Sequence, residues 1–238
     1  MSLSKKLLVG CSLAILTALS LEASSKEESF NRGEVIYQET CISCHGKNGE
    51  TNQEMQLIVK PRKLNKTILT LEQSFKIIKE GGHHWGAHSD LMPAFKYVYS
   101  DSEIMDIAYY INKKFNSKVN ARVKKLLEES DVISKEEKLK MDKIGKKIFR
   151  RNCSLCHGID GSGKSDYVEQ SKASNNFIYP YDLRRTLLTQ DQIFLYAKFG
   201  GHYWGTDKDD MPSWKKKYSD MKLKAVAKYV KEKIKKIK

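Results

Sequence analysis

Beyond residue 23, the sequence lacks the features of a membrane-spanning or disulfide-stapled protein. The 238 residues include only five cysteines and four prolines, and 40% of them are hydrophobic. After residue 23 no apolar stretch is long enough to cross a bilayer, and every cysteine there lies in one of two short motifs. No cysteine is left for a separate structural disulfide. The hydrophobic content is low for a globular protein but remains above that of disordered chains.

The two cysteine motifs share one pattern, Cys-x-x-Cys-His-Gly, at residues 41–46 and 153–158. This pattern is typical of covalent attachment of c-type haem. Two thiols that stand two residues apart can each add to a vinyl group of one haem, and the histidine that follows can bind the iron. The sequence therefore predicts two haem c groups. Their attachment residues are Cys41, Cys44, Cys153 and Cys156, and their proximal iron ligands are His45 and His157.

Two other uses of Cys-x-x-Cys pairs fit the sequence less well. A redox dithiol of the thioredoxin type belongs to a strand–helix–strand context, of which this sequence shows no sign. A structural zinc site combines two such pairs that are separated by a short stretch of chain. Here more than a hundred residues separate the pairs, and a histidine follows each of them.

Residues 1–23 have the composition of a secretory signal peptide. Two lysines precede an apolar stretch at residues 7–21, and small residues suitable for cleavage follow at Ser20 or Ala23. An uncleaved anchor helix is an alternative, although the apolar run is short for a span. A lipoprotein signal at Cys11 is a second alternative, although the apolar stretch before that cysteine is too short. We expect an exported protein whose mature chain begins near residue 24.

The chain is strongly basic, with a formal net charge of +14. A basic surface suits nucleic acid, anionic lipid or an acidic protein partner. Nucleic acid is not expected, because the chain is predicted to be exported and contains no nucleic-acid motif. We therefore expect redox protein partners with acidic docking faces. A solvated lysine-rich surface without a specific partner, or a loose association of the lysine-rich C-terminus with a membrane surface, are the alternatives.

The second part of the chain repeats the first part in register. PRKLNKTILT from Pro61 matches PYDLRRTLLT from Pro180, and GGHHWG from Gly81 matches GGHYWG from Gly200. The final segments match as well, and the second copy carries seven extra residues in the loop after its glycine-rich turn. We call residues that share a position in the two copies equivalent. The repeat predicts two copies of one domain.

Each copy is expected to be helical. Short helices at 72–79 and 191–198 end at glycine pairs, and a last helix follows Ser100 and Glu103, which have the spacing of a capping box. The same spacing occurs at Ser25 with Glu28 and at Ser134 with Glu137. We predict an all-α fold with domain 1 at 24–115, a charged and partly helical connector at 116–133, and domain 2 at 134–238.

One Met-Pro pair occurs in each copy, at Met92 and Met211. A thioether is a soft ligand that binds haem iron opposite histidine and raises its reduction potential. We predict Met92 and Met211 as the second iron ligands. Bis-histidine ligation is the alternative, and its candidates are His83, His84, His88 and His202. Otherwise these histidines and the neighbouring tryptophans are expected to form hydrogen bonds near the haem edge or the propionates. Candidates for binding the haem propionates are Arg62 and Arg184, for which a solvated role is equally compatible.

An early Cys-x-x-Cys-His, a late Met-Pro and a final amphipathic helix with Tyr110 or Tyr229 resemble the class I cytochrome c domain. The resemblance covers about residues 27–115 and 135–235, and the chain is similar to tandem di-haem cytochromes c of the bacterial periplasm. It implies an all-α fold around each haem, an iron that cycles between Fe(III) and Fe(II), and electron transfer through a partly exposed haem edge. The Gly-Gly-His-x-Trp-Gly element has no role that the resemblance assigns.

The expected function is single-electron transfer between redox partners of a respiratory chain. With histidine and methionine on both irons, no coordination position would be open for a substrate. One alternative is a di-haem enzyme, either a peroxidase or a sulfur-compound oxidoreductase. The sulfur-oxidising type uses a cysteine ligand that this chain cannot supply, and a peroxidase needs an iron that opens a position. Another alternative is a cytochrome subunit of a larger dehydrogenase or reductase.

Overall fold

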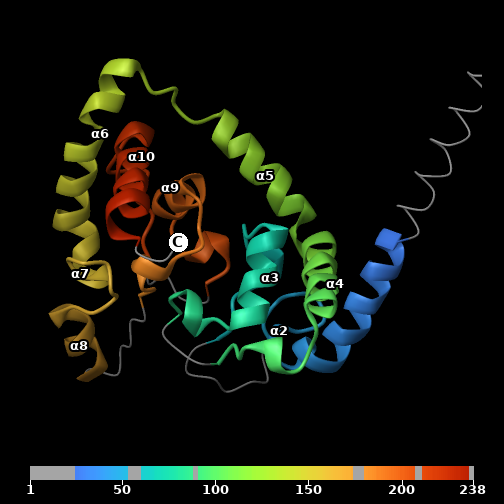
Figure 1. The fold of residues 1–238 in the computed structure, drawn as a ribbon. Coiled ribbons are helices and arrows are strands. Elements are labelled where there is room, and N and C mark those ends of the chain that lie inside the picture. The colour runs from blue at the N-terminus through green and yellow to red at the C-terminus, as the bar shows by residue number, and fades with distance from the viewer. Residues whose placement is uncertain (1–24, 53–59, 88–90, 174–179, 207–210, 236–238) are drawn as a thin grey trace, which may run out of the picture.

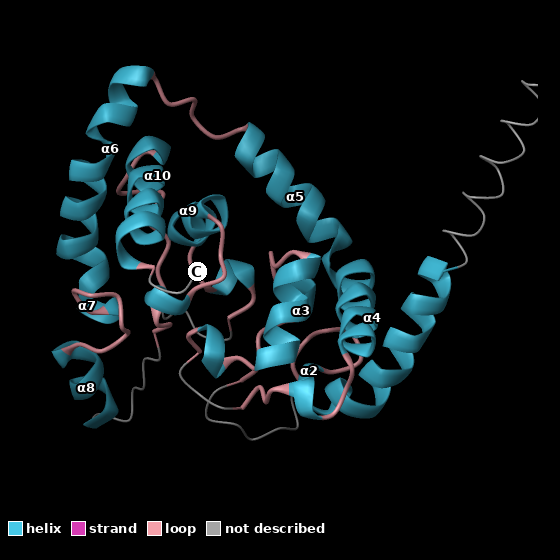
Figure 2. Cartoon of the chain, viewed as in Figure 1, coloured by secondary structure: helices cyan, strands magenta, loops and turns pink. Residues whose placement is uncertain are grey.

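The computed structural model describes residues 25–52, 60–87, 91–173, 180–206 and 211–235. The predicted signal peptide and His88 lie outside these ranges. Within them every regular element is helical (Figures 1 and 2). The longer helices are the first helix (25–36), α3 (Leu71–Glu80), α4 (Asp101–Ile111), α5 (Ser117–Glu128), α6 (Lys135–Ile148), α8 (Asp166–Ala173), α9 (Gln190–Phe199) and α10 (Asp220–Tyr229).

Side-chain caps set several helix starts. Ser100 accepts a hydrogen bond from the Glu103 N–H, and the Glu103 side chain accepts one from the Ser100 N–H. The same reciprocal pair joins Ser134 and Glu137 at the start of α6. Both predicted capping boxes are confirmed. Ser25, in contrast, is already helical where the described chain begins.

The inserted loop of the second copy contains an element that the sequence does not predict. Residues Asp166–Ala173 form α8, whereas a loop was expected. The Val168 N–H donates to the Ser165 hydroxyl, 3.2 Å away, which satisfies one of the amide groups at the start of the helix. Val168 is buried, so the helix packs against the rest of its half rather than projecting into solvent.

The same helix order appears twice, which confirms the tandem all-α architecture. The first half runs from the first helix to α4, and the second half runs from α6 to α10 (Figure 1). In each half the first and last helices cross at a glycine. A Cβ atom at Gly33 would collide with the Asp106 carbonyl, and one at Gly145 would collide with the Ala225 carbonyl. Only glycine allows these helix backbones to approach so closely.

Aromatic side chains fill the crossing of these helices. Tyr37 is fully buried in the first half, and its ring centre lies 5.3 Å from that of Tyr110 and 5.5 Å from that of Phe115. Its equivalent Phe149 is fully buried in the second half, 5.4 Å from the ring of Tyr229. These rings lie beside the segments that lead into the two cysteine motifs, so the core holds each motif in place.

The two halves pack against each other through equivalent residues. The Lys63 N–H donates to the Gly205 carbonyl over 3.0 Å, and the Asp182 N–H donates to the Gly86 carbonyl over 2.9 Å. Lys63 is equivalent to Asp182 and Gly86 to Gly205, so the two bonds are related by an approximate twofold symmetry. The sequence left open whether the domains pack together, and the structure shows that they do.

A pair of buried glutamines lies at the same interface. Gln73 and Gln192 are equivalent, and each amide donates to the side-chain oxygen of the other, over 2.8 and 2.9 Å. Each amide also donates to a backbone carbonyl of the opposite half, Leu187 for Gln73 and Ile68 for Gln192. Buried polar groups lower stability unless they are paired, and this arrangement pairs both amides fully.

The segment between the halves is a helix that packs on the second half. α5 continues from α4 through a π-helical turn at Asn112–Asn116. Val119 is buried in the second core, and the Arg122 guanidinium lies over the rings of Tyr203 and Trp204 at 4.6 and 5.2 Å. The connector is therefore a structural element that packs on the second half.

No helix of the described ranges is long and apolar enough to cross a membrane.

Replacing one interfacial glutamine should weaken the packing of the halves. Gln73→Ala removes the donor to the Leu187 carbonyl, both bonds to the Gln192 amide, and the Gln73 side-chain oxygen that accepts from the Thr70 N–H in the capping box of α3. We expect a loss of about 1–3 kcal/mol in the free energy of unfolding, measured by urea denaturation. Gln170→Ala on the exposed face of α8 is the control and should change stability by less than about 0.5 kcal/mol. A Gln73→Ala protein as stable as this control would contradict the assignment.

Candidate functional site

Each cysteine motif forms a very short helix behind a π-helical turn. α2 (Ile42–His45) follows the turn Tyr37–Cys41, and α7 (Ser154–His157) follows the turn Phe149–Cys153. Turns of this kind are rare and often mark functional sites. The Tyr37 hydroxyl donates to the Gly46 carbonyl over 2.7 Å and ties the end of α2 to the core. Each motif thus places two thiols and one imidazole on adjoining turns of helix.

No disulfide joins any of the four cysteines Cys41, Cys44, Cys153 and Cys156. Burial, followed by the neighbouring thiol, raises the pKa of Cys41 to about 12, and the same causes raise that of Cys153 to about 12. A redox-active dithiol needs the opposite, a lowered thiol pKa. Among the described residues no three His, Cys, Asp or Glu side chains gather to hold a metal ion by themselves. The raised thiol pKa values therefore argue against the dithiol alternative.

The histidines of the motifs are set up as neutral ligands. Burial lowers the pKa of His45 and of His157, and a backbone carbonyl opposes this in each case, that of Arg62 and that of Tyr181. His157 Nδ1 lies 3.2 Å from the Tyr181 oxygen. Because a carbonyl only accepts, Nδ1 carries the proton and Nε2 keeps its lone pair for a metal. His45 Nδ1 is buried beside the equivalent carbonyl without a well-aligned bond.

In each half a Gly-Gly pair, at residues 81–82 or 200–201, holds the loop that carries the Met-Pro pair, which we call the methionine loop. The Gly82 N–H donates to the Met92 carbonyl over 2.9 Å, and the Gly201 N–H donates to the Met211 carbonyl over 2.8 Å. Gly81 has φ 80° and ψ 160°, which is a conformation that essentially only glycine adopts. A Cβ atom there would lie 2.9 Å from the Met92 oxygen.

The last glycine of the same element makes the contact between the halves described above. The Gly-Gly-His-x-Trp-Gly element therefore positions the methionine and joins the domains. Its recurrence in register was the signal in the sequence. Its role could not be assigned there, because its partners lie far away along the chain.

The tryptophans of the element form hydrogen bonds with the backbone. Trp85 Nε1 donates to the Lys76 carbonyl over 3.0 Å, and Trp204 Nε1 donates to the Leu195 carbonyl over 3.0 Å. Both acceptors belong to the preceding helix of the same half. The only donor of each indole is thus used within its own half, and the position of these bonds near the haem edge or the propionates stays a prediction.

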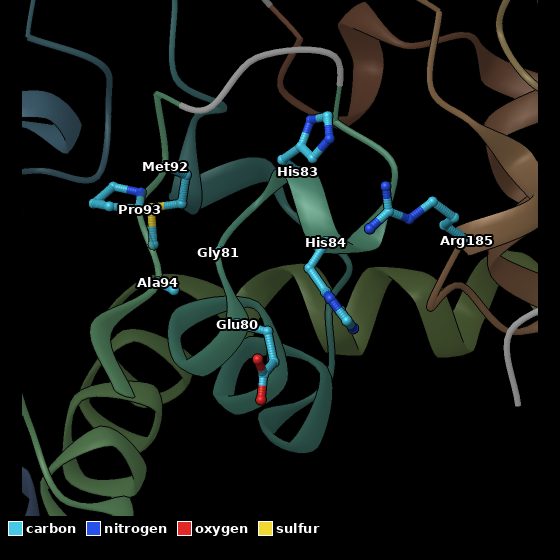
Figure 3. A pocket seen from close by; sticks show the side chains of 8 residues that line it. All are labelled: Glu80, Gly81, His83, His84, Met92, Pro93, Ala94 and Arg185. Carbon is cyan, nitrogen blue, oxygen red and sulfur yellow. The ribbon is translucent and has the colours of Figure 1, made fainter. Parts of the chain in front are cut away.

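A pocket of about 380 Å³ opens beside the first methionine (Figure 3). Met92 and His83 both line it, so the methionine and histidine candidates for the first site stand at one location. Arg185 extends into it from the second half, toward His83 and His84. The lining residues are Glu80, Gly81, His83, His84, Met92, Pro93, Ala94 and Arg185.

The two arginine candidates have different surroundings. Arg184 binds both oxygens of Asp182, at 2.9 and 2.8 Å, and reaches Asp160 at 3.1 Å. These two carboxylates give it a structural role within its own half. Arg62 instead crosses the interface and donates to the hydroxyl groups of Tyr181 and Tyr196, at 3.2 and 2.5 Å.

The donor set in each half fits a covalently bound haem. Cys41 and Met92 pack against the core of the first half, and Cys153 and Met211 pack against the core of the second. Each half thus brings one thiol and one thioether to the same core, and the second thiol and the imidazole lie on the short helix that follows the first thiol. These are the groups that c-type haems use for attachment and iron ligation.

Comparison with known proteins agrees with this chemistry. The sequence profile of the family described as "Cytochrome C oxidase, cbb3-type, subunit III" matches residues 28–111 and again residues 141–230. A curated relative, the Cbb3-type cytochrome c oxidase subunit CcoP of Cereibacter sphaeroides, is 22% identical over 222 residues. That match covers 90% of this chain and 64% of the relative, so the chain spans less than two thirds of the relative's length.

Among solved structures, a chain of the Kuenenia stuttgartiensis reducing HAO-like protein complex is similar. It is 19% identical, the match covers 84% of this chain and 94% of that one, and the TM-score is 0.41. A likeness this distant carries no argument about fold or function.

The Gly-Gly pair offers a test of how the methionine loop is positioned. Gly81→Ala forces a side chain into a glycine-only conformation, at a cost of about 1–3 kcal/mol, and against the Met92 carbonyl. We expect the loop to shift and the methionine–iron absorption band of the holoprotein to lose about half its intensity.

Gly200→Ala is the matched variant and should remove the contribution of the second site instead. The double variant should lose the band entirely. A Gly81→Ala protein with a full methionine–iron band would show that Gly81 does not position Met92.

Proposed function

We propose, from the premise that this chain belongs to the cbb3-type cytochrome c oxidase subunit III family, that it is a di-haem electron-transfer protein. The family matches both halves, so the chain is a haem-binding c-type cytochrome built from tandem cytochrome c domains. Beyond this, we propose one haem in each half and single-electron transfer between redox proteins of a respiratory chain. The observation that carries the proposal is the repeated donor set, packed on its own core in each half.

The residues have separate tasks in each site. Cys41 and Cys44 would hold the first haem covalently, and Cys153 and Cys156 the second. His45 and His157 would present Nε2 to the iron, because a carbonyl stands at Nδ1. The loops held by the glycine pairs would present the sulfur atoms of Met92 and Met211. Bound haem supplies the Fe(III)/Fe(II) couple.

Ligation by histidine and methionine on both irons would leave no position for a substrate. This favours a carrier over a peroxidase, which needs an open or exchangeable position. The location of His83 beside Met92 is the feature of the structure that bears on the alternative, since a histidine could replace the methionine there. The ligand test below distinguishes these two cases.

The proposed location is the periplasm, and the proposed partners are proteins with acidic docking faces. The net charge of +14 attracts such faces over long distances. In the second half, three exposed lysines follow directly after the methionine loop: Lys215, Lys216 and Lys217. We propose that a partner approaches the second site over these lysines, so that charge attraction and the electron-transfer route would coincide.

A second candidate function is that of a subunit held permanently in an oxidase complex. The family description and the curated relative favour it, because both are oxidase subunits by name. The chemistry of the two halves would be the same in either case. Isolation of the native protein by gentle extraction distinguishes them, since a free carrier migrates at the size of one chain and a subunit migrates with an oxidase.

Methionine substitution tests both the haem content and the ligands. The wild-type holoprotein should contain two covalent haems per chain, both low-spin and inert to carbon monoxide. Met92→Ala and Met211→Ala should each make one of the two haems bind carbon monoxide, as measured by reduced difference spectra. Their reduction potentials should fall, because a methionine ligand raises the potential.

Met105→Ala, which removes a methionine from the exposed face of α4, is the control and should behave as wild type. One haem per chain in the wild type would refute the two-site proposal. A wild-type haem that binds carbon monoxide readily would favour the enzyme alternative, and peroxide would then be tested as a substrate.

Salt dependence tests the electrostatic part of the proposal. Oxidation of the reduced protein by the anion hexacyanoferrate(III) should slow as ionic strength rises from about 0.01 to about 0.15 M, where the Debye length shortens from about 30 to about 8 Å. Lys216→Glu should slow the reaction at low salt more than Lys143→Glu, an equal charge change on α6. Equal rates for the two variants would show that the lysines after Met211 do not guide the oxidant.

A further inference from the structure

The two predicted haem sites are connected through one pair of equivalent residues. Arg62 in the first half and Tyr181 in the second occupy the same position of the repeat. The backbone carbonyl of each faces the proximal histidine of its own half, His45 for Arg62 and His157 for Tyr181. One residue on each side therefore touches the imidazole that would bind the iron.

The side chains of the same two residues meet across the interface. The Arg62 guanidinium lies over the Tyr181 ring, 4.6 Å from its centre, and Arg62 Nε donates to the Tyr181 hydroxyl over 3.2 Å. These contacts join end to end, so that a continuous chain of contacting residues leads from His45 through Arg62 and Tyr181 to His157.

The pair is asymmetric although the interface is nearly symmetric. Two arginines at these equivalent positions would repel each other, and two tyrosines would carry no charge. An arginine over a tyrosine ring gives an attractive cation–π contact. A second tyrosine, Tyr196, accepts from Arg62 Nη1 and holds the guanidinium from the other side.

Among the described residues, the side chains that accept hydrogen bonds from Arg62 are uncharged. Arginine stays protonated in proteins, and no carboxylate of the described residues forms an ion pair with Arg62. Its partners are neutral phenols, and burial raises the pKa of Tyr196 further from neutrality. A positive charge thus stands between the two sites in a partly buried setting, where screening by water is weak.

We propose that Arg62 and Tyr181 are the residues that position the two sites for electron transfer to each other, and that the Arg62 charge raises both reduction potentials. The step moves one electron from the Fe(II) centre of one half, which becomes Fe(III), to the Fe(III) centre of the other, which becomes Fe(II). It needs no proton and no other reactant. This inference depends on the proposal above that each half holds a haem.

The charge effect follows from electrostatics. Reduction lowers the positive charge of the iron by one, so a nearby positive charge favours the reduced form. Both proximal histidines contact this pair, so both potentials should respond to Arg62. Arg62→Lys keeps the charge and should therefore keep both potentials. It should still disturb the contact with Tyr181, because the lysine ammonium lacks the planar guanidinium with its several N–H donors.

The test compares Arg62→Gln with Arg62→Lys in the full-length holoprotein. Potentiometric titration gives the two potentials, and photoinduced reduction of one haem followed by optical detection gives the rate of transfer between the haems. Arg62→Gln should lower both potentials by about 59 mV, which corresponds to a tenfold change in the equilibrium constant of a one-electron reduction. It should also slow the electron transfer between the haems. Arg62→Lys should slow the transfer and leave the potentials near those of the wild type.

Arg32→Gln is the matched control, because it removes an arginine that pairs with Asp106 within the first half. It should change neither the transfer rate nor the second potential. Small-angle scattering shows whether the halves remain packed in each variant. If Arg62→Gln separates the halves, Arg62→Lys and Tyr181→Phe, which keeps the ring, carry the comparison.

The proposal is wrong if the transfer rate of the charge-conserving variants equals that of the wild type, or if both potentials of Arg62→Gln are unchanged. The haem content of the wild type is measured in the same experiment. A chain with fewer than two haems refutes the proposed function itself. A chain with two haems and an insensitive Arg62 refutes this inference alone.

Discussion

Two amide groups, bonded to each other at the centre of the molecule, hold the duplicated halves in register. Gln73 and Gln192 use their donors on the opposite half while their oxygens also accept from the N-caps of their own helices, α3 and α9. A shift of one half along the other would break all of these bonds together and leave buried amides unpaired, which is costly. The position of the halves therefore depends on this pair more than on the size of either core.

The interface contacts that lie next to the predicted haem sites depend on this relative position of the two halves. Lys63 and Asp182 reach the glycines of the opposite half, which in turn continue into the elements that hold the methionine loops. Arg62 directly precedes Lys63, so the same extended segment that forms the interface also passes the proximal histidine His45. Packing of the domains and geometry of the sites are thus parts of one arrangement.

Local features of the fold were predictable from the sequence, and contacts between distant segments were not. The capping boxes at Ser100 and Ser134 and the helices that end at glycine pairs depend on a few neighbouring residues, and they are confirmed. The motif chemistry at Cys41 and Cys153 is equally local. The ligand roles of Met92 and Met211 remain predictions, although the structure places both beside the cores that hold the cysteines.

The features that the sequence does not predict belong to segments whose partners lie elsewhere in the chain. The Trp85 N–H donates to the carbonyl of Lys76, a partner that the motif around Trp85 does not indicate. α8 formed where a loop was expected, because the burial of Val168 depends on the rest of the second half. Nothing near Arg62 in the sequence indicates that Tyr181 and Tyr196 surround it.

The interface also has the form of a contact between two copies of one protein. In a twofold dimer, residue i of one subunit meets residue j of its partner, and j meets i in return. Lys63 with Gly205 and Asp182 with Gly86 obey this rule, and Gln73 with Gln192 lies where a symmetry axis would pass. A single ancestral domain with these residues meets the requirements of a self-complementary dimer, so fusion of two gene copies would preserve an existing contact. Fusion would then free equivalent positions to diverge, and the arginine opposite a tyrosine is an arrangement that no symmetric dimer of identical chains can have.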